Sequence, residues 1–185
     1  MLPLPNLESI QERLLELPAL FRAYEERDAM FADLAREWLN RLEHELENNK
    51  VPVAGAIAGL RGLAISAERG MIPPGISFVG APTARKVRDA TAAEALRRAE
   101  ETVSNTLRAD LTQIDEARRL IRQMVAFAVQ RGLAGAGGGA GSHNDEVHAI
   151  WSALQRDPDI GAGATRVVAL AGPQNALILL GRELP

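Results

Sequence analysis

The 185-residue chain contains no cysteine, which excludes disulfides, thiolate zinc sites and cysteine nucleophiles. Aromatic residues make up only 4% of the chain, although hydrophobic residues as a whole make up 46%. A core that is rich in alanine and leucine and poor in large rings favours closely packed helices over a β-sandwich. The composition therefore predicts a mainly α-helical fold.

Signals for export and for membrane insertion are also lacking. The opening residues 1–6 have neither the basic start nor the continuous apolar run of a signal peptide. The apolar stretch 51–67 contains Arg61, and the stretch 167–180 is broken by the Gly-Pro-Gln-Asn segment 172–175. Neither stretch reaches the ~20 apolar residues of a membrane span. We expect cytoplasmic synthesis and no membrane partner.

The most informative segment is 91–132, which has no proline and no glycine before its last residue. At a rise of ~1.5 Å per residue, a helix of about forty residues would be roughly 60 Å long. Thr91 and Glu94 have the spacing of a capping box, so we expect the helix to begin there. A helix of this length needs partner helices, either in the same chain or in neighbouring copies.

Apolar residues in this segment recur in two series with a seven-residue period. The first series is Leu107, Ile114, Ile121 and Ala128, and the second is Leu96, Val103, Asp110, Ala117 and Met124. This spacing is typical of a coiled-coil seam, but Asp110 interrupts it. The pattern therefore favours packing in an antiparallel helical bundle over a two-stranded zipper.

The N-terminal part is expected to complete that bundle over residues 1–134. Residues 2–6 form a proline-punctuated arm, and Asn6 can cap a short helix that Pro18 ends. A second helix is predicted from Ala19 to about Asn48. A third is predicted from Pro52 to Arg69, ended by Gly70.

The C-terminal part, residues 143–185, follows a glycine-rich linker at residues 135–142. Ser142 can cap a short helix whose apolar face includes Trp151. Two apolar runs then flank the turn at 172–175, which predicts a β-hairpin. Because an isolated hairpin is barely stable in water, we expect it to pair with another chain.

Two segments invite a chemical interpretation. The glycine run 135–141 precedes a helix, as phosphate-binding loops do, but the preceding strand and the Lys-Ser/Thr pair of that motif are missing. His143, Asp145 and His148 carry suitable atoms for zinc binding or acid–base catalysis. The two histidines are five positions apart, however, and so point in different directions on a helix. We predict no catalytic, cofactor or metal site, with a small enzyme using these three residues as a remaining alternative.

Basic residues in the long helix could contact nucleic acid. They are Arg85, Lys86, Arg88, Arg97, Arg98, Arg118, Arg119 and Arg122. Carboxylates lie between them, and the whole chain has a pI near 5.7. This mixture favours ion pairs within or between subunits over nucleic-acid binding. The alternative is a helical regulatory or adaptor module that binds DNA or a protein partner.

The first seven residues, Met1-Leu-Pro-Leu-Pro-Asn-Leu7, resemble the start of some bacteriophage tail and baseplate structural proteins. In those proteins a short proline-punctuated arm precedes helices. The resemblance implies a virion component of the tail or connector type.

Together, these features predict a non-enzymatic structural protein that assembles with copies of itself and with other structural proteins. Helix packing and exchanged terminal segments would hold the oligomer together. The residues predicted to form the interface are Leu107, Ile114, Ile121, Met124, Trp151, Val167, Val168, Leu170, Leu177 and Leu179.

Overall fold

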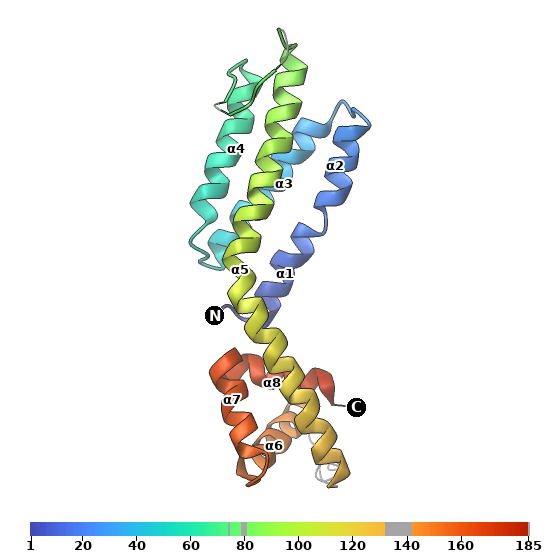
Figure 1. The fold of residues 1–185 in the computed structure, drawn as a ribbon, viewed down its shortest axis with the longest axis vertical. Helices are drawn as coiled ribbons and strands as arrows, with labels where there is room; N and C mark the ends of the chain where they lie inside the picture. Colours follow the sequence, from blue (N-terminus) through green and yellow to red (C-terminus); the bar gives the residue numbers. More distant parts are fainter. Residues whose placement is uncertain (74, 79–80, 132–141, 185) are drawn as a thin grey trace. The chain divides into compact units, whose positions relative to one another are not determined.

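The computed structural model describes residues 1–73, 75–78, 81–131 and 142–184, and these residues are mostly helical (Figure 1). The helices are α1 (Leu4–Leu14), α2 (Leu17–Glu25), α3 (Phe31–Asn48), α4 (Ala54–Glu68), α5 (Ala84–Gln130), α6 (His143–Arg156), α7 (Gly161–Ala171) and α8 (Pro173–Glu183). The prediction of a mainly α-helical chain built on one long helix is confirmed. No strand occurs among the described residues.

The long helix α5 has 47 residues and begins earlier than the sequence predicts. The hydroxyl of Thr83 accepts the Lys86 backbone N–H at 3.2 Å and so caps the first turn. Thr91 lies inside the helix, where its hydroxyl donates to the Val87 carbonyl at 2.8 Å. The predicted capping box at Thr91 and Glu94 is therefore wrong, because the helix already continues through both residues.

Contacts divide the chain into two units, which we describe separately. The N-terminal unit comprises Asn6–Leu107, and the C-terminal unit comprises Met1–Pro5 together with Arg108–Pro185. Helix α5 contributes residues to both units. The linker predicted at 135–142 lies, apart from Ser142, outside the described residues.

The core of the N-terminal unit is built around α3 and α4, which pack side by side. Trp38, Leu39 and Leu42 of α3 are fully buried, and so is Ile57 of α4. The helix predicted at Pro52–Arg69 is thus present as α4, and Gly70 ends it with a φ of 82°.

The single helix predicted from Ala19 to Asn48 is wrong, because the chain breaks between α2 and α3. The break is a left-handed turn in which Arg27 has a φ of 57° and the Asp28 N–H donates to the Ala23 carbonyl at 2.9 Å. The rings of Tyr24 and Phe31 then meet across the turn, with centroids 5.1 Å apart. The apolar residues on both sides of the break fit one continuous helical period. Their spacing alone therefore does not reveal the turn.

In the C-terminal unit, α6, α7 and α8 contact one another. The capping prediction for α6 is confirmed, since Ser142 and Asp145 form a reciprocal capping box. The β-hairpin prediction is wrong, because both apolar runs are helices joined at Gly172. Gly172 has φ 78° and ψ 161°, a conformation that ends α7, and Pro173 then starts α8.

The burial pattern explains why these runs are helical. The buried residues of α7 are Ala164, Val167 and Ala171, and those of α8 are Asn175, Ala176, Leu179 and Leu180. Their separations of three and four place them on one helical face, whereas a strand would bury every second residue. Short apolar runs without polar residues between them do not reveal this difference.

We predict that Gly172→Ala destabilises the chain by about 1–3 kcal/mol, because residues with a side chain rarely adopt this conformation. Gly62→Ala in α4 is the matched control, since an added methyl group there meets no atom within 4 Å. The control should raise stability by about 0.5–1 kcal/mol. Urea unfolding followed by circular dichroism measures both. Equal effects of the two substitutions would contradict this assignment of Gly172.

Candidate assembly site

The arm predicted at residues 2–6 is shorter than expected, because α1 begins at Leu4 and Asn6 lies inside that helix instead of capping it. Residues 1–5, which we call the arm, therefore include the first turn of α1, and they have an unusual pattern of backbone donors. Pro3 and Pro5 have no N–H group, so only Leu2 and Leu4 present backbone amides between the terminus and Asn6. The Leu2 N–H donates to the Asp110 carboxylate at 3.0 Å, and the Leu4 N–H donates to the Asn175 side-chain oxygen at 2.7 Å. Both amides of the arm are thus bound by side chains that lie far away in the sequence.

Asn175 is the centre of this contact. It lies in the first turn of α8 and is only 5% exposed. Besides accepting from Leu4, its amide donates to the Leu2 carbonyl at 3.1 Å and to the Ala171 carbonyl at 2.9 Å. One buried side chain thereby binds two groups of the arm and the end of α7. We call Asp110 and Asn175 together the arm acceptor.

Asp110 is the residue that interrupts the apolar series of α5. Its neighbours along that face, Ile114 and Ala117, are buried, whereas Asp110 is half-buried. A carboxylate at this position would disfavour a continuous apolar seam, but here it accepts a charge-assisted hydrogen bond from the arm. The polar interruption therefore coincides with the place where the arm binds.

The structure places most of the predicted interface residues in the interior of the chain. Those that are buried are Leu107, Ile114, Ile121, Met124, Trp151, Val167 and Leu179. Three others, Val168, Leu170 and Leu177, are only half-buried. The seven buried side chains pack within this chain, which leaves the three half-buried ones on α7 and α8 accessible to another chain.

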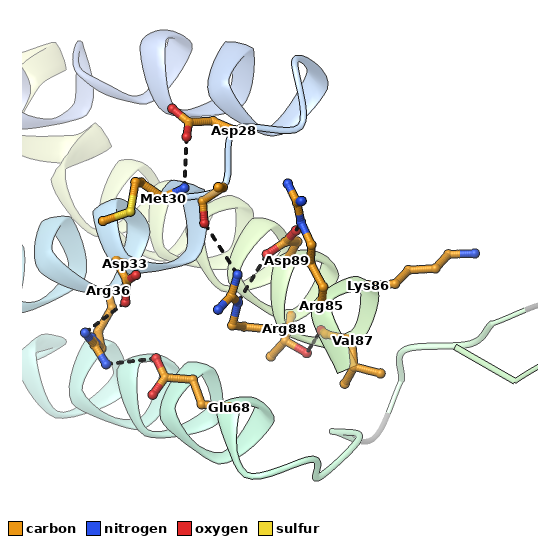
Figure 2. Close-up of polar contacts among 12 residues, drawn as sticks. Asp28, Met30, Asp33, Arg36, Glu68, Arg85, Lys86, Val87, Arg88 and Asp89 are labelled. Carbon is orange, nitrogen blue, oxygen red and sulfur yellow. Dashed lines mark hydrogen bonds and ion pairs between the residues drawn. The ribbon is translucent and has the colours of Figure 1, made fainter. Parts of the chain in front are cut away.

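The basic residues at the start of α5 are engaged within the N-terminal unit (Figure 2). Arg85 donates to the Arg27 carbonyl at 2.6 Å and Arg88 to the Ala29 carbonyl at 3.5 Å, so both hold the turn between α2 and α3. Both also pair with Asp89. Only Lys86 points away from this cluster in Figure 2.

Glu94 binds the next two arginines along α5. It lies 2.9 Å from Arg97 and 2.7 Å from Arg98. The hydrogen bond from Arg97, with further contributions from Arg98, lowers the pKa of the Glu94 carboxyl from 4.5 to about 2, although partial burial opposes the shift. The same contact raises the pKa of Arg97.

Two of the remaining arginines of α5 also have carboxylate partners. Arg118 pairs with Asp115 at 3.4 Å and Arg122 with Glu183 at 2.9 Å. Of the eight basic residues that could contact nucleic acid, six therefore form ion pairs within the described part of the chain. This is the intramolecular pairing that the mixed charges favour.

The histidine-containing segment is the start of α6. Asp145 accepts hydrogen bonds from the hydroxyl and the backbone N–H of Ser142, and these bonds lower its pKa. His143 and His148 line a surface pocket together with Leu177 and Ile178 of α8. No three acidic or histidine side chains among the described residues are grouped to hold a metal ion. Asp145 thus acts as a helix cap.

Among the helices in the described part of the chain, none is both long and apolar enough to cross a membrane. No protein-family model, curated protein or solved structure matches the chain. We therefore infer its function from the geometry of the arm and of the arm acceptor.

Sequence reasoning placed the start of the first helix too late and missed Asn175. The sequence shows Asn175 beside Gly172 and Pro173, where it is typical of a turn. One signal was present, since the amide side chain of Asn175 lies at the edge of a long apolar run. A polar side chain buried at such a position needs hydrogen-bond partners. Nothing in the sequence indicates that those partners lie in the first four residues.

We predict that Asn175→Ala lowers the free energy of unfolding by at least about 1–3 kcal/mol, because it leaves the buried Leu4 N–H without its acceptor. Gln174→Ala is the matched control, since Gln174 is exposed in the same turn of α8. It should change stability by less than about 0.5 kcal/mol. Thermal unfolding of both variants measures the difference. A loss of similar size in the control would show that Asn175 has no special role.

The Glu94 contacts predict a dependence of stability on pH. Because folding lowers the pKa of this carboxyl, its contribution is complete above about pH 4.5 and disappears as the pH falls toward about 2. Allowing for solvent screening, Glu94→Gln should cost about 1 kcal/mol at pH 7. Urea unfolding at several pH values tests whether the two curves converge in acid. A constant difference down to pH 2 would contradict the ion-pair origin.

Proposed function

We propose that this chain is a non-enzymatic structural protein that oligomerises through helix packing and exchanged terminal segments. The observation that carries the proposal is the bound arm. Its hydrogen bonds join residues 108 and 171 positions apart, and both bind backbone groups of the arm. Exchange of a terminal segment between identical copies is a low-cost route to an oligomer.

Helix packing between copies is supported by the apolar side chains that the chain leaves partly uncovered. Val168 and Leu170 of α7 and Leu177 of α8 are half-buried. A neighbouring copy that covered them would add apolar burial, which is the main favourable term in most protein association. The exchanged terminal segments would provide specific hydrogen bonds between copies. The faces of α7 and α8 would provide the apolar area that is buried between them.

The most specific form of the proposal is a virion component of the tail or connector type. Its support is the resemblance of residues 1–7 to the start of phage tail and baseplate proteins.

The adaptor alternative gains less support. A DNA-binding surface needs cationic side chains that are free to meet phosphates. Three of the candidate arginines instead bind carboxylates or backbone carbonyls of the N-terminal unit. They are Arg85, Arg88 and Arg97. Salt-sensitive binding of nucleic acid by the full chain would revive the adaptor interpretation.

We predict that the unmodified chain is a discrete oligomer by light scattering on a size-exclusion column, and that Leu170→Gln lowers its mass to at most half. The glutamine amide would disfavour burial against another copy. Ala169→Gln, at the exposed neighbouring position of α7, should leave the mass unchanged. Circular dichroism checks that both variants remain folded. A monomeric unmodified chain would contradict the proposed function.

A further inference from the structure

We infer that a groove on the N-terminal unit binds a cationic amphipathic helix of a different protein. The groove lies where α1 and α2 meet beside α5 (Figure 1), and its volume is about 620 Å³. Every residue that lines it belongs to the N-terminal unit. The inference therefore goes beyond the proposed function and does not depend on oligomerisation.

The groove has an apolar wall at the bend between α1 and α2. In a continuous helix the ring of Pro18 would clash with the carbonyl of Leu14, so α1 ends at Leu14. The bend leaves Leu15 76% exposed, more than any other large apolar side chain in the described part of the chain. All three side chains line the groove. A partner that covers Leu15 therefore gains apolar burial, which is the main favourable term in most protein association.

Carboxylates surround this apolar wall. Glu8 and Glu12 lie one turn apart on α1, Glu100 lies on α5, and none of the described residues that line the groove is basic. Glu12 and Glu100 are exposed and form no ion pair within the described part of the chain. By contrast, Glu43 and Glu94 of the same unit pair with arginine side chains. The negative charges of Glu12 and Glu100 are therefore available to a partner.

The sign of this charge decides which class of partner fits. Nucleic acids and anionic lipid surfaces are negatively charged, so the groove repels them. A second copy of this chain fits poorly, because the apolar face of its long helix α5 is buried and most of the basic residues on that helix already pair with carboxylates. A cationic segment of another protein fits, since its lysine or arginine side chains can pair with Glu12 and Glu100 while its apolar side chains cover Leu15.

The walls of the groove favour a helical occupant. They are helices, whose backbone groups bond within each helix, so they offer no strand edge to an extended peptide. The bound segment must therefore satisfy its own backbone groups, as an α-helix does. Between Glu8 and Leu15 the groove follows about two turns of α1, so a partner helix of about three turns covers it. Apolar anchors at positions i, i+3 or i+4, and i+7 would face the apolar wall.

The test uses the full-length chain and a fluorescein-labelled synthetic peptide. The peptide has about 14 residues, with leucines at positions i, i+3, i+4 and i+7 and lysines beside them. A second peptide carries glutamate in place of every lysine. Fluorescence anisotropy measures the Kd of each. We expect saturable binding of the lysine peptide and a Kd at least about tenfold higher for the glutamate peptide, because the carboxylates of the groove repel it.

Variants of the chain locate the binding site. The double substitution Glu12→Lys and Glu100→Lys should raise the Kd of the lysine peptide by at least about fivefold, since both charges of the groove are reversed. The matched control is Glu25→Lys with Glu26→Lys, which changes the net charge equally at exposed positions outside the groove. This control should leave the Kd unchanged within about twofold, because distant exposed charges are screened.

The apolar wall is tested separately. Leu15→Ala should raise the Kd by at least about threefold, whereas Met30→Ala, at a position 56% exposed outside the groove, should leave it unchanged. Circular dichroism checks that all variants are folded. Absence of saturable binding by the lysine peptide, or equal effects of the groove variants and their controls, would overturn the inference. Equal binding of the glutamate peptide would overturn it as well. These results are separate from the mass of the oligomer, which tests the proposed function.

Discussion

The apolar face of α5 is the constraint on which the rest of the structure depends. Its buried residues recur at separations of three and four from Ala92 to Ala128, over most of a 47-residue helix. So long a face must be covered along its whole length, because apolar surface left in water is unfavourable. In the N-terminal unit, α4 lies beside the first half, with Leu60 and Leu63 close to Ala95. In the C-terminal unit, α7 approaches the second half, where Gly163 lies against Met124.

Asp110 is the exception on this face, and it links the helix to the proposed assembly. A polar group among apolar ones costs free energy unless it has a partner, and the arm provides that partner through Leu2. Asn175 plays the equivalent role on α8, where it is the polar member of an otherwise apolar buried set. At both positions a polar side chain stands among apolar ones and binds backbone groups of Leu2 or Leu4. That combination is typical of contacts in which the identity of the partner matters.

The parts of this fold that the sequence predicts are those determined by local signals. Long periodicity identified α5, and the Ser142 cap identified the start of α6, since both depend on neighbouring residues. The hairpin prediction failed because apolar runs around Gly172 satisfy a strand and a helix equally well, and only packing against α6 decides between them. Asn175 could not be predicted as an acceptor, because its partners are 171 and 173 positions away.

The most direct test of arm-mediated assembly is amide hydrogen exchange at Leu2 and Leu4, measured on the unmodified chain over a range of protein concentrations. If the arm binds a second copy, protection of both amides falls on dilution, because dissociation releases the arm. Protection should then follow the mass of the oligomer at each concentration. Strong protection that does not change on dilution would show that the arm binds its own chain, and would contradict the account.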